Sequence, residues 1–216
     1  MQAEKSGRNE ERLYPKDLLS LANAVLGLAA IYQAITFETL NAFLLILAAI
    51  AFDFADGFIA RKSKRGPTKI GRELDSLADV VSFGIAPIVI AFTAPTAIAS
   101  TSLPELWFST IILYAASGIY LICALVRLAK FNIQKEAGVY HGLPSPIAAF
   151  IVSGTSVLLA ESFSLFCQPP SALSTSGVFM NYCIPNAGDY ALLIQAFVLA
   201  AAGGLMIARF KTRKFW

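Results

Sequence analysis

The chain has 216 residues, of which 56% are hydrophobic and only 14% are charged, and its formal net charge is +3. This apolar share and the mean hydropathy of +0.64 exceed those of an ordinary soluble domain, so the composition excludes a water-soluble fold and predicts an integral membrane protein. The small positive charge requires no nucleic-acid partner, because basic residues at the ends of membrane spans bind anionic head groups.

Six apolar stretches are each long enough to cross the bilayer core as a helix. They cover residues 18–37, 40–60, 74–94, 106–126, 146–166 and 190–209. The polar residues before the first span do not form the pattern of a signal peptide. We therefore expect an all-α integral membrane protein with a polar segment at 1–17, a six-helix membrane domain at 18–210 and a basic tail at 211–216.

All 17 lysines and arginines fall in segments that this arrangement of spans places on one side of the membrane. They occur before the first span, between the second and third, between the fourth and fifth, and after the last. Such basic segments mark the cytoplasmic side. Both termini are therefore expected in the cytoplasm.

Asn23 is a polar residue in an otherwise apolar first span. Two roles remain open for it. Its amide either supports the ligands of a functional site from a distance or forms a hydrogen bond that packs two membrane helices.

Four aspartates lie in the second and third apolar stretches: Asp53 and Asp56 in DFADGFIAR, and Asp75 and Asp79 in GRELDSLAD. Each carboxylate costs about 2.5 to 3.5 kcal/mol in hydrocarbon, so the group needs a compensating partner. Spacings of three and four residues place each pair on one face of its helix. A short turn joins the two spans, so we expect all four carboxylates to meet near its end of the membrane.

Oxygen ligands alone suit a hard divalent cation such as Mg2+ or Mn2+, and two such ions would neutralise four carboxylates. The chain has one histidine and no cluster of cysteine and histidine, so zinc is not favoured.

Gly57 and Ala60 follow the second aspartate, and their small size permits either close approach of a flat ligand or tight helix packing. The basic turn from Arg61 to Arg72 suits a ligand that carries phosphate, although anchoring to head groups is an alternative for its lysines.

Together the two acidic segments resemble the signature of the CDP-alcohol phosphotransferases, DxxDGxxAR followed by GxxxDxxxD. Nine residues separate Arg61 from Gly71 here, where about eight are expected, and Gly66 and Pro67 place the extra residue in the turn. The segments LLSLANAVLGL, SLADVVSFGIAP, RLAKFN and GLPSPIA are similar to the phosphatidylserine synthase branch of this family.

The resemblance implies metal-dependent transfer of a phosphatidyl group from CDP-diacylglycerol to the hydroxyl of L-serine, with release of CMP. It also implies a homodimer in the cytoplasmic membrane, with the active site facing the cytoplasm. The metal ions would be held by Asp53, Asp56, Asp75 and Asp79, with Asp79 also acting as the base. The CDP donor would meet Asp56, Gly57, Ala60, Arg61, Gly71 and Asn23.

The carboxylate of serine needs a cation of its own. Arg127 stands at the cytoplasmic end of the fourth span and is the candidate for this clamp, with interfacial anchoring as its alternative. The full set of residues expected to bind serine is Arg127, Lys130, Asn132 and Ser82.

Structural roles are expected for several prolines, glycines and cysteines. Pro87 is expected to kink the third span, Pro144 and Pro146 to begin the fifth, and Gly203 and Gly204 to allow close helix contact in the sixth. Cys123 is expected in the core, whereas Cys167 and Cys183 are either a disulfide or two separate thiols in the loop after span five.

Two other kinds of function remain open. The same chemistry can use another acceptor, such as glycerol 3-phosphate or an inositol phosphate, or an archaeal ether lipid as donor. A cation transporter would also hold carboxylates in the membrane, but these would follow a path across the bilayer. The clustering of all four at one end beneath a basic turn favours an enzyme.

Overall fold

The computed structural model describes residues 17–62, 69–98, 107–133, 140–166, 187–208 and 211–212. Their elements are α2 (Asp17–Ile35), α3 (Thr39–Lys62), α4 (Lys69–Asp79), η1 (Val80–Ile85), α5 (Ala86–Ile98), α6 (Trp107–Ile133), β1 (Tyr140–His141), α7 (Ser145–Phe166), α8 (Ala187–Ile207) and β2 (Lys211–Thr212). The elements α4, η1 and α5 follow one another without a gap, and η1 is a π-helical segment.

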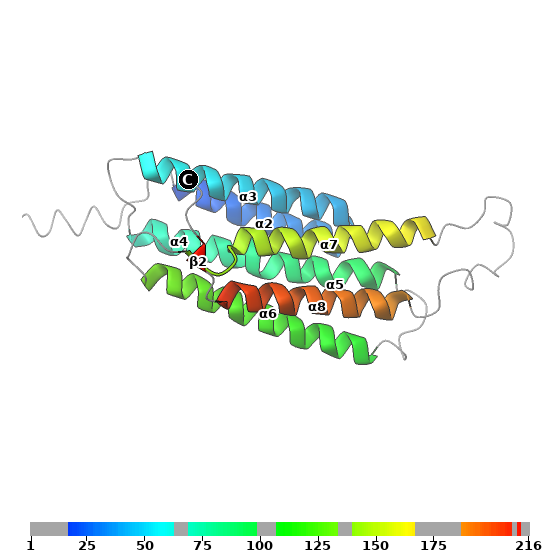
Figure 1. Cartoon of the computed structure of the whole chain (residues 1–216). Helices are drawn as coiled ribbons and strands as arrows, with labels where there is room; N and C mark the ends of the chain where they lie inside the picture. Colours follow the sequence, from blue (N-terminus) through cyan, green and yellow to red (C-terminus); the bar gives the residue numbers. More distant parts are fainter. Residues whose placement is uncertain are drawn as a thin grey trace, which may run out of the picture.

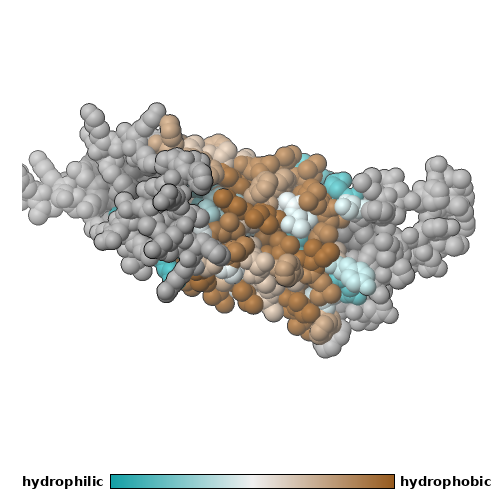
Figure 2. Space-filling view, viewed as in Figure 1, coloured by the Kyte–Doolittle hydropathy of each residue, from teal (hydrophilic) through white to brown (hydrophobic). Residues whose placement is uncertain are grey.

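Six helical units in the described ranges are long and apolar enough to span a membrane, and the third of them runs through α4, η1 and α5. Figure 2 shows the corresponding hydrophobic band across the middle of the molecule, with hydrophilic residues toward its ends. The strands β1 and β2 contain two residues each and pair antiparallel. The predicted helical membrane fold with six spans is therefore confirmed.

The helices run alongside one another, and one end of the bundle gathers the starts of α2, α4 and α7 and the ends of α3, α6 and α8 (Figure 1). Every lysine and arginine in the described ranges belongs to an element at this end, which we call the basic end. This is the clustering expected from the positions of the basic residues in the sequence. The location of the basic end in the cytoplasm remains a prediction.

A tight turn folds α3 back along α2. Phe37 has a positive φ of 63°, its N–H donates to the carbonyl of Ala34 at 3.0 Å, and the N–H of Glu38 donates to the carbonyl of Gln33 at 2.9 Å. These bonds satisfy carbonyls at the end of α2 that the helix itself leaves without partners. Because α2 also packs against α4, it lies against both helices that carry the aspartates.

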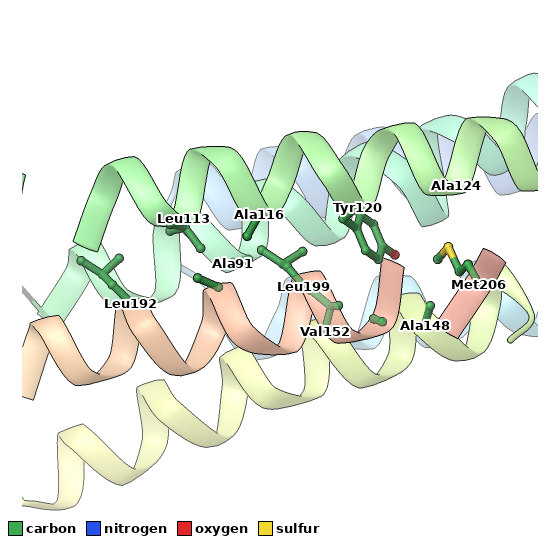
Figure 3. Close-up of a cluster of buried hydrophobic side chains, with 12 residues drawn as sticks. Ala91, Leu113, Ala116, Tyr120, Ala124, Ala148, Val152, Leu192, Leu199 and Met206 are labelled. Atoms are coloured by element: carbon green, nitrogen blue, oxygen red, sulfur yellow. The ribbon is translucent and has the colours of Figure 1, made fainter. Parts of the chain in front are cut away.

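Two hydrophobic clusters hold the bundle together. The first joins α5, α6, α7 and α8 through side chains that include Leu113, Tyr120 and Leu199 (Figure 3). The second joins α2, α3, η1, α5 and α7, and more than half of its fully buried members are alanines. Small side chains let membrane helices approach closely, so the second cluster fixes α2 firmly against the helices that carry the aspartates.

The third span contains a π-helical segment next to Pro87, and the kink expected at this proline remains a prediction. The π-helical segment η1 lies between Asp79 and Pro87, and the N–H of Ala86 reaches back to the carbonyl of Val81. Pro87 is the second residue of α5, and it is fully buried. The missing N–H of the proline is thus accommodated beside a wider helical turn.

The remaining structural expectations have mixed outcomes. Cys123 is a buried free thiol, as expected, whereas Cys167 and Cys183 lie outside the described residues. Pro144 and Pro146 flank the first residue of α7, as predicted. A Cβ on Gly203 would lie 3.1 Å from the Cα of Tyr120, but nothing lies within 4 Å of a Cβ on Gly204, so close packing occurs at the first glycine only.

Candidate metal-binding active site

Three of the four aspartates converge at the basic end of the bundle. Asp53 comes from α3, and Asp75 and Asp79 come from α4. One carboxylate oxygen from each of the three lies within 4.8 Å of the others. Asp53 and Asp75 are half-buried, and Asp79 is only 9% exposed. The helical spacing predicted from the sequence therefore does bring the two spans' carboxylates together.

Asp56 lies next to this group of three rather than within it. Its Oδ2 accepts a hydrogen bond from the hydroxyl of Ser20 at 3.3 Å. The same hydroxyl lies 3.5 Å from Oδ1 of Asp75. Ser20, on α2, thus connects the fourth aspartate to the other three.

The chemistry of this donor set fits a divalent cation. Several carboxylates held this close in a largely buried site repel one another strongly unless a positive charge lies between them. Carboxylate oxygens are the ligands that Mg2+ and Mn2+ prefer. The aspartate cluster is therefore compatible with divalent metal binding.

Asn23 contacts the most buried aspartate directly. Its Nδ2 donates to Oδ1 of Asp79 at 3.2 Å, and the Asn23 side chain is 1% exposed. Its backbone carbonyl accepts a hydrogen bond from the hydroxyl of Ser82 at 2.8 Å. Of the two roles left open for Asn23, the structure shows the hydrogen bond between helices, and that bond reaches a predicted site residue.

Ser82, which is expected to bind serine, is fully buried, and its hydroxyl donates to the backbone of α2. A Cβ on Gly27 would overlap Ser82, so only glycine permits this contact between α2 and η1. The sequence placed Ser82 one turn beyond Asp79, but that face of the helix is covered by α2.

The residues expected to meet the CDP donor lie around the aspartates. Gly57 follows Asp56 on α3 and is exposed, whereas Gly71 is buried on α4, one turn before Asp75. Ala60 and Arg61 belong to the last turns of α3, and their side chains lie outside the described part of the structure. The helices therefore bring all four positions to the basic end.

Arg127 belongs to the same end of the bundle as the aspartates. It is half-buried near the end of α6. Its Nη1 donates to the hydroxyl of Ser145 at 2.6 Å. Lys130 is exposed one turn further along α6, and the side chain of Asn132 is not among those described.

Two residues that contact predicted site residues were not singled out from the sequence. Ser20 precedes Asn23 by three residues and Asn23 precedes Gly27 by four, so the three share one face of the first span. This stripe of polar and small residues could have indicated that the first span faces the aspartates. Ser145 lies between two prolines at the start of α7, and no pattern in the sequence connects it to Arg127.

Residues 15–208 match the CDP-alcohol phosphatidyltransferase family, so the chain belongs to this family. It is 35% identical over 132 residues to a CDP-diacylglycerol–serine O-phosphatidyltransferase of Bacillus subtilis, which covers 61% of this chain and 68% of that protein. It is 34% identical over 139 residues to an archaetidylserine synthase of Methanothermobacter thermautotrophicus, which covers 63% of this chain and 55% of that protein.

A similar match connects the chain to a CDP-diacylglycerol–serine O-phosphatidyltransferase of Saccharomyces cerevisiae, with 31% identity over 159 residues, 66% of this chain and 53% of that protein. Across these three relatives the matched region spans between 53% and 68% of their length. No solved structure matches the chain significantly.

Proposed function

We propose that this protein transfers a phosphatidyl group from CDP-diacylglycerol to L-serine, forming phosphatidylserine and releasing CMP. The observation that carries the proposal is the convergence of Asp53, Asp75 and Asp79 at the basic end of the bundle. Membership of the family supports the reaction type. Relatives that are named serine phosphatidyltransferases support serine as the acceptor.

In this proposal Asp53, Asp75 and Asp79, with Asp56 beside them, hold divalent cations. We favour Mg2+ or Mn2+ and a pair of ions, since two divalent charges balance four carboxylates. Bound there, such ions would neutralise the diphosphate of the donor and the charge that develops on departing CMP. Gly57, Ala60, Arg61 and Gly71 then border the nucleotide, at positions where the backbone or a cation can approach phosphate.

Asp79 takes the proton of the serine hydroxyl in this scheme. The serine oxygen forms a bond to the phosphorus that carries the lipid, the bond from that phosphorus to the CMP oxygen breaks, and the proton passes to the Asp79 carboxylate. The amide of Asn23 occupies one oxygen of this carboxylate and so fixes its orientation. The base is thereby held in one position before substrate arrives.

Arg127 binds the carboxylate of serine, and Ser145 orients the guanidinium through their hydrogen bond. Lys130 and Asn132 remain candidates for the rim of this site, on the last turns of α6. We leave Ser82 out of the proposed serine site because its hydroxyl is fully buried against Asn23.

We further propose that the basic end faces the cytoplasm from the inner membrane. Residues 1–17 and 211–216 then flank the membrane domain of 18–210 on the cytoplasmic side, and lipid tails enter the site sideways between helices. The resemblance of the chain to its family also favours a homodimer, which chemical cross-linking of the purified protein would detect.

The donor lipid is less narrowly defined than the acceptor. The relative from Methanothermobacter is an archaetidylserine synthase, and its identity to this chain is close to that of the Bacillus relative. An ether-linked CDP-archaeol is therefore a second candidate donor, whereas serine is the acceptor in both cases.

The acceptor is tested with purified protein, CDP-diacylglycerol, Mn2+ and labelled serine. We expect CMP and labelled phosphatidylserine in equal amounts. Glycerol 3-phosphate and inositol 1-phosphate, offered in place of serine, are expected to give neither product. CMP release with either phosphate acceptor and not with serine would contradict the proposal.

A further inference from the structure

The third span contains a buried backbone carbonyl near a proline that cannot donate to it. In a regular α-helix the carbonyl of Phe83 would accept a hydrogen bond from the N–H of residue 87, and that residue is Pro87, which has none. Both residues are fully buried. In hydrocarbon a carbonyl without a donor is strongly unfavourable, because no water can replace the missing bond.

A donor for this carbonyl comes from another helix. The hydroxyl of Tyr120, on α6, donates to the carbonyl of Phe83 at 2.8 Å. Tyr120 is fully buried, and its side chain extends from α6 into the hydrophobic cluster (Figure 3). Gly203 of α8 packs closely against the backbone of Tyr120, so the tyrosine is held between α8 and η1.

This hydrogen bond lies between two parts of the site. Phe83 is one helical turn beyond Asp79. Arg127 is seven residues beyond Tyr120 and therefore on the same face of α6, two turns closer to the basic end. The bond thus joins the helix that carries Asp75 and Asp79 to the helix that carries Arg127.

We infer that Tyr120 is a positioning residue of the active site. Its hydroxyl replaces the N–H that Pro87 lacks, holds the π-helical turn after Asp79 in place and keeps the aspartates in register with Arg127. The part of this inference that concerns turnover rests on the proposed function. The part that concerns metal binding does not.

The test is a double-mutant cycle on the full-length purified protein, with Tyr120→Phe made in the natural chain and in Pro87→Ala. The affinity for Mn2+ is measured without substrates, followed by kcat and KM. Removing a residue that supports metal ligands commonly changes affinity or activity by about 10- to 100-fold, so we expect Tyr120→Phe to weaken Mn2+ binding and lower kcat by about tenfold. In the Pro87→Ala background residue 87 supplies an N–H, and Tyr120→Phe is expected to have no further effect.

Ser117→Ala is the matched control. Ser117 is also a buried hydroxyl on α6, but it donates to the carbonyl of Leu113 in its own helix at 2.7 Å. This variant is expected to leave the Mn2+ affinity and kcat unchanged. A purely structural role for Tyr120 would lower the unfolding temperature without changing the Mn2+ affinity of the folded protein.

The inference is overturned if Tyr120→Phe binds Mn2+ as the natural chain does, or if its effect is the same in both backgrounds. If Tyr120→Phe alone fails to fold, the double variant Pro87→Ala, Tyr120→Phe is compared with Pro87→Ala. The inference then requires that these two proteins bind Mn2+ with equal affinity. If the natural chain shows no transfer to serine, the proposed function fails, and the Mn2+ measurements still decide the role of Tyr120.

Discussion

At the scale of single residues, Asp79 combines burial with a fixed orientation. It is the last residue of α4, and one of its oxygens accepts the amide of Asn23 while the carboxylate faces Asp53 and Asp75. Removing its charge without changing its size separates the chemistry of the site from its packing. The substitution Asp79→Asn does this.

We expect Asp79→Asn to lower kcat by about 100-fold or more, the contribution typical of a positioned base, while binding of the CDP donor is largely retained. Release of CMP and equilibrium binding of CDP-diacylglycerol measure the two effects. Asp189→Asn is the control, because Asp189 lies in the first turn of α8 at the opposite end of the bundle and accepts a hydrogen bond from Ser109. Full turnover by Asp79→Asn would remove this residue from the role of base.

The sequence was sufficient to find the four aspartates, because carboxylates in apolar stretches are rare and need a partner. It was not sufficient to separate Asp56 from the other three or to show that Ser82 turns toward α2. Both depend on how far each helix is rotated about its axis, and helical spacing fixes only which residues share a face. Ser20 and Ser145 were missed for the same reason, since each acts across a contact between helices.

At the scale of elements, α2 is the support of the site. It provides Ser20 to Asp56 and Asp75, and Asn23 to Asp79. Gly27 allows its backbone to approach Ser82 of η1. A change at this glycine therefore tests whether the contact between α2 and η1 is needed, without altering any polar group.

In Gly27→Ala the new Cβ would lie 2.8 Å from the Cα of Ser82, so the two helices must separate. We expect a loss of about 1 to 3 kcal/mol in unfolding free energy, as for other overpacked sites, together with reduced turnover. Thermal unfolding in detergent and CMP release measure these effects. Gly204→Ala is the control, because nothing lies within 4 Å of its Cβ, and equal stability of the two variants would contradict the importance of this contact.

The positions of the six spans could be predicted from apolar length alone, and the structure confirms them with shifts of a few residues at their ends. The π-helical segment could not be predicted from apolar length. Pro87 predicts a disturbance of the third span, but the sequence does not show that the carbonyl of Phe83 accepts a hydrogen bond from the hydroxyl of Tyr120, 37 residues further along the chain.

At the scale of the whole molecule, the bundle brings its four membrane aspartates and its described lysines and arginines to one end. The aspartates are contributed by α3 and α4, their hydrogen-bond donors by α2, and Arg127 by α6, held by Ser145 of α7. A hydrophobic band separates this end from the other (Figure 2). This arrangement suits a reaction between a lipid in the bilayer and two water-soluble groups, serine and the CDP head.

The most direct test is transfer to serine before and after removal of divalent metal from the purified protein. We expect treatment with a chelator to abolish the formation of labelled phosphatidylserine, and added Mn2+ or Mg2+ to restore it while Ca2+ does so poorly. The replacement of both Asp53 and Asp75 by Asn is expected to prevent this restoration. Full activity in protein shown to be free of metal would contradict the assignment of the aspartate cluster as a metal centre for phosphatidyl transfer.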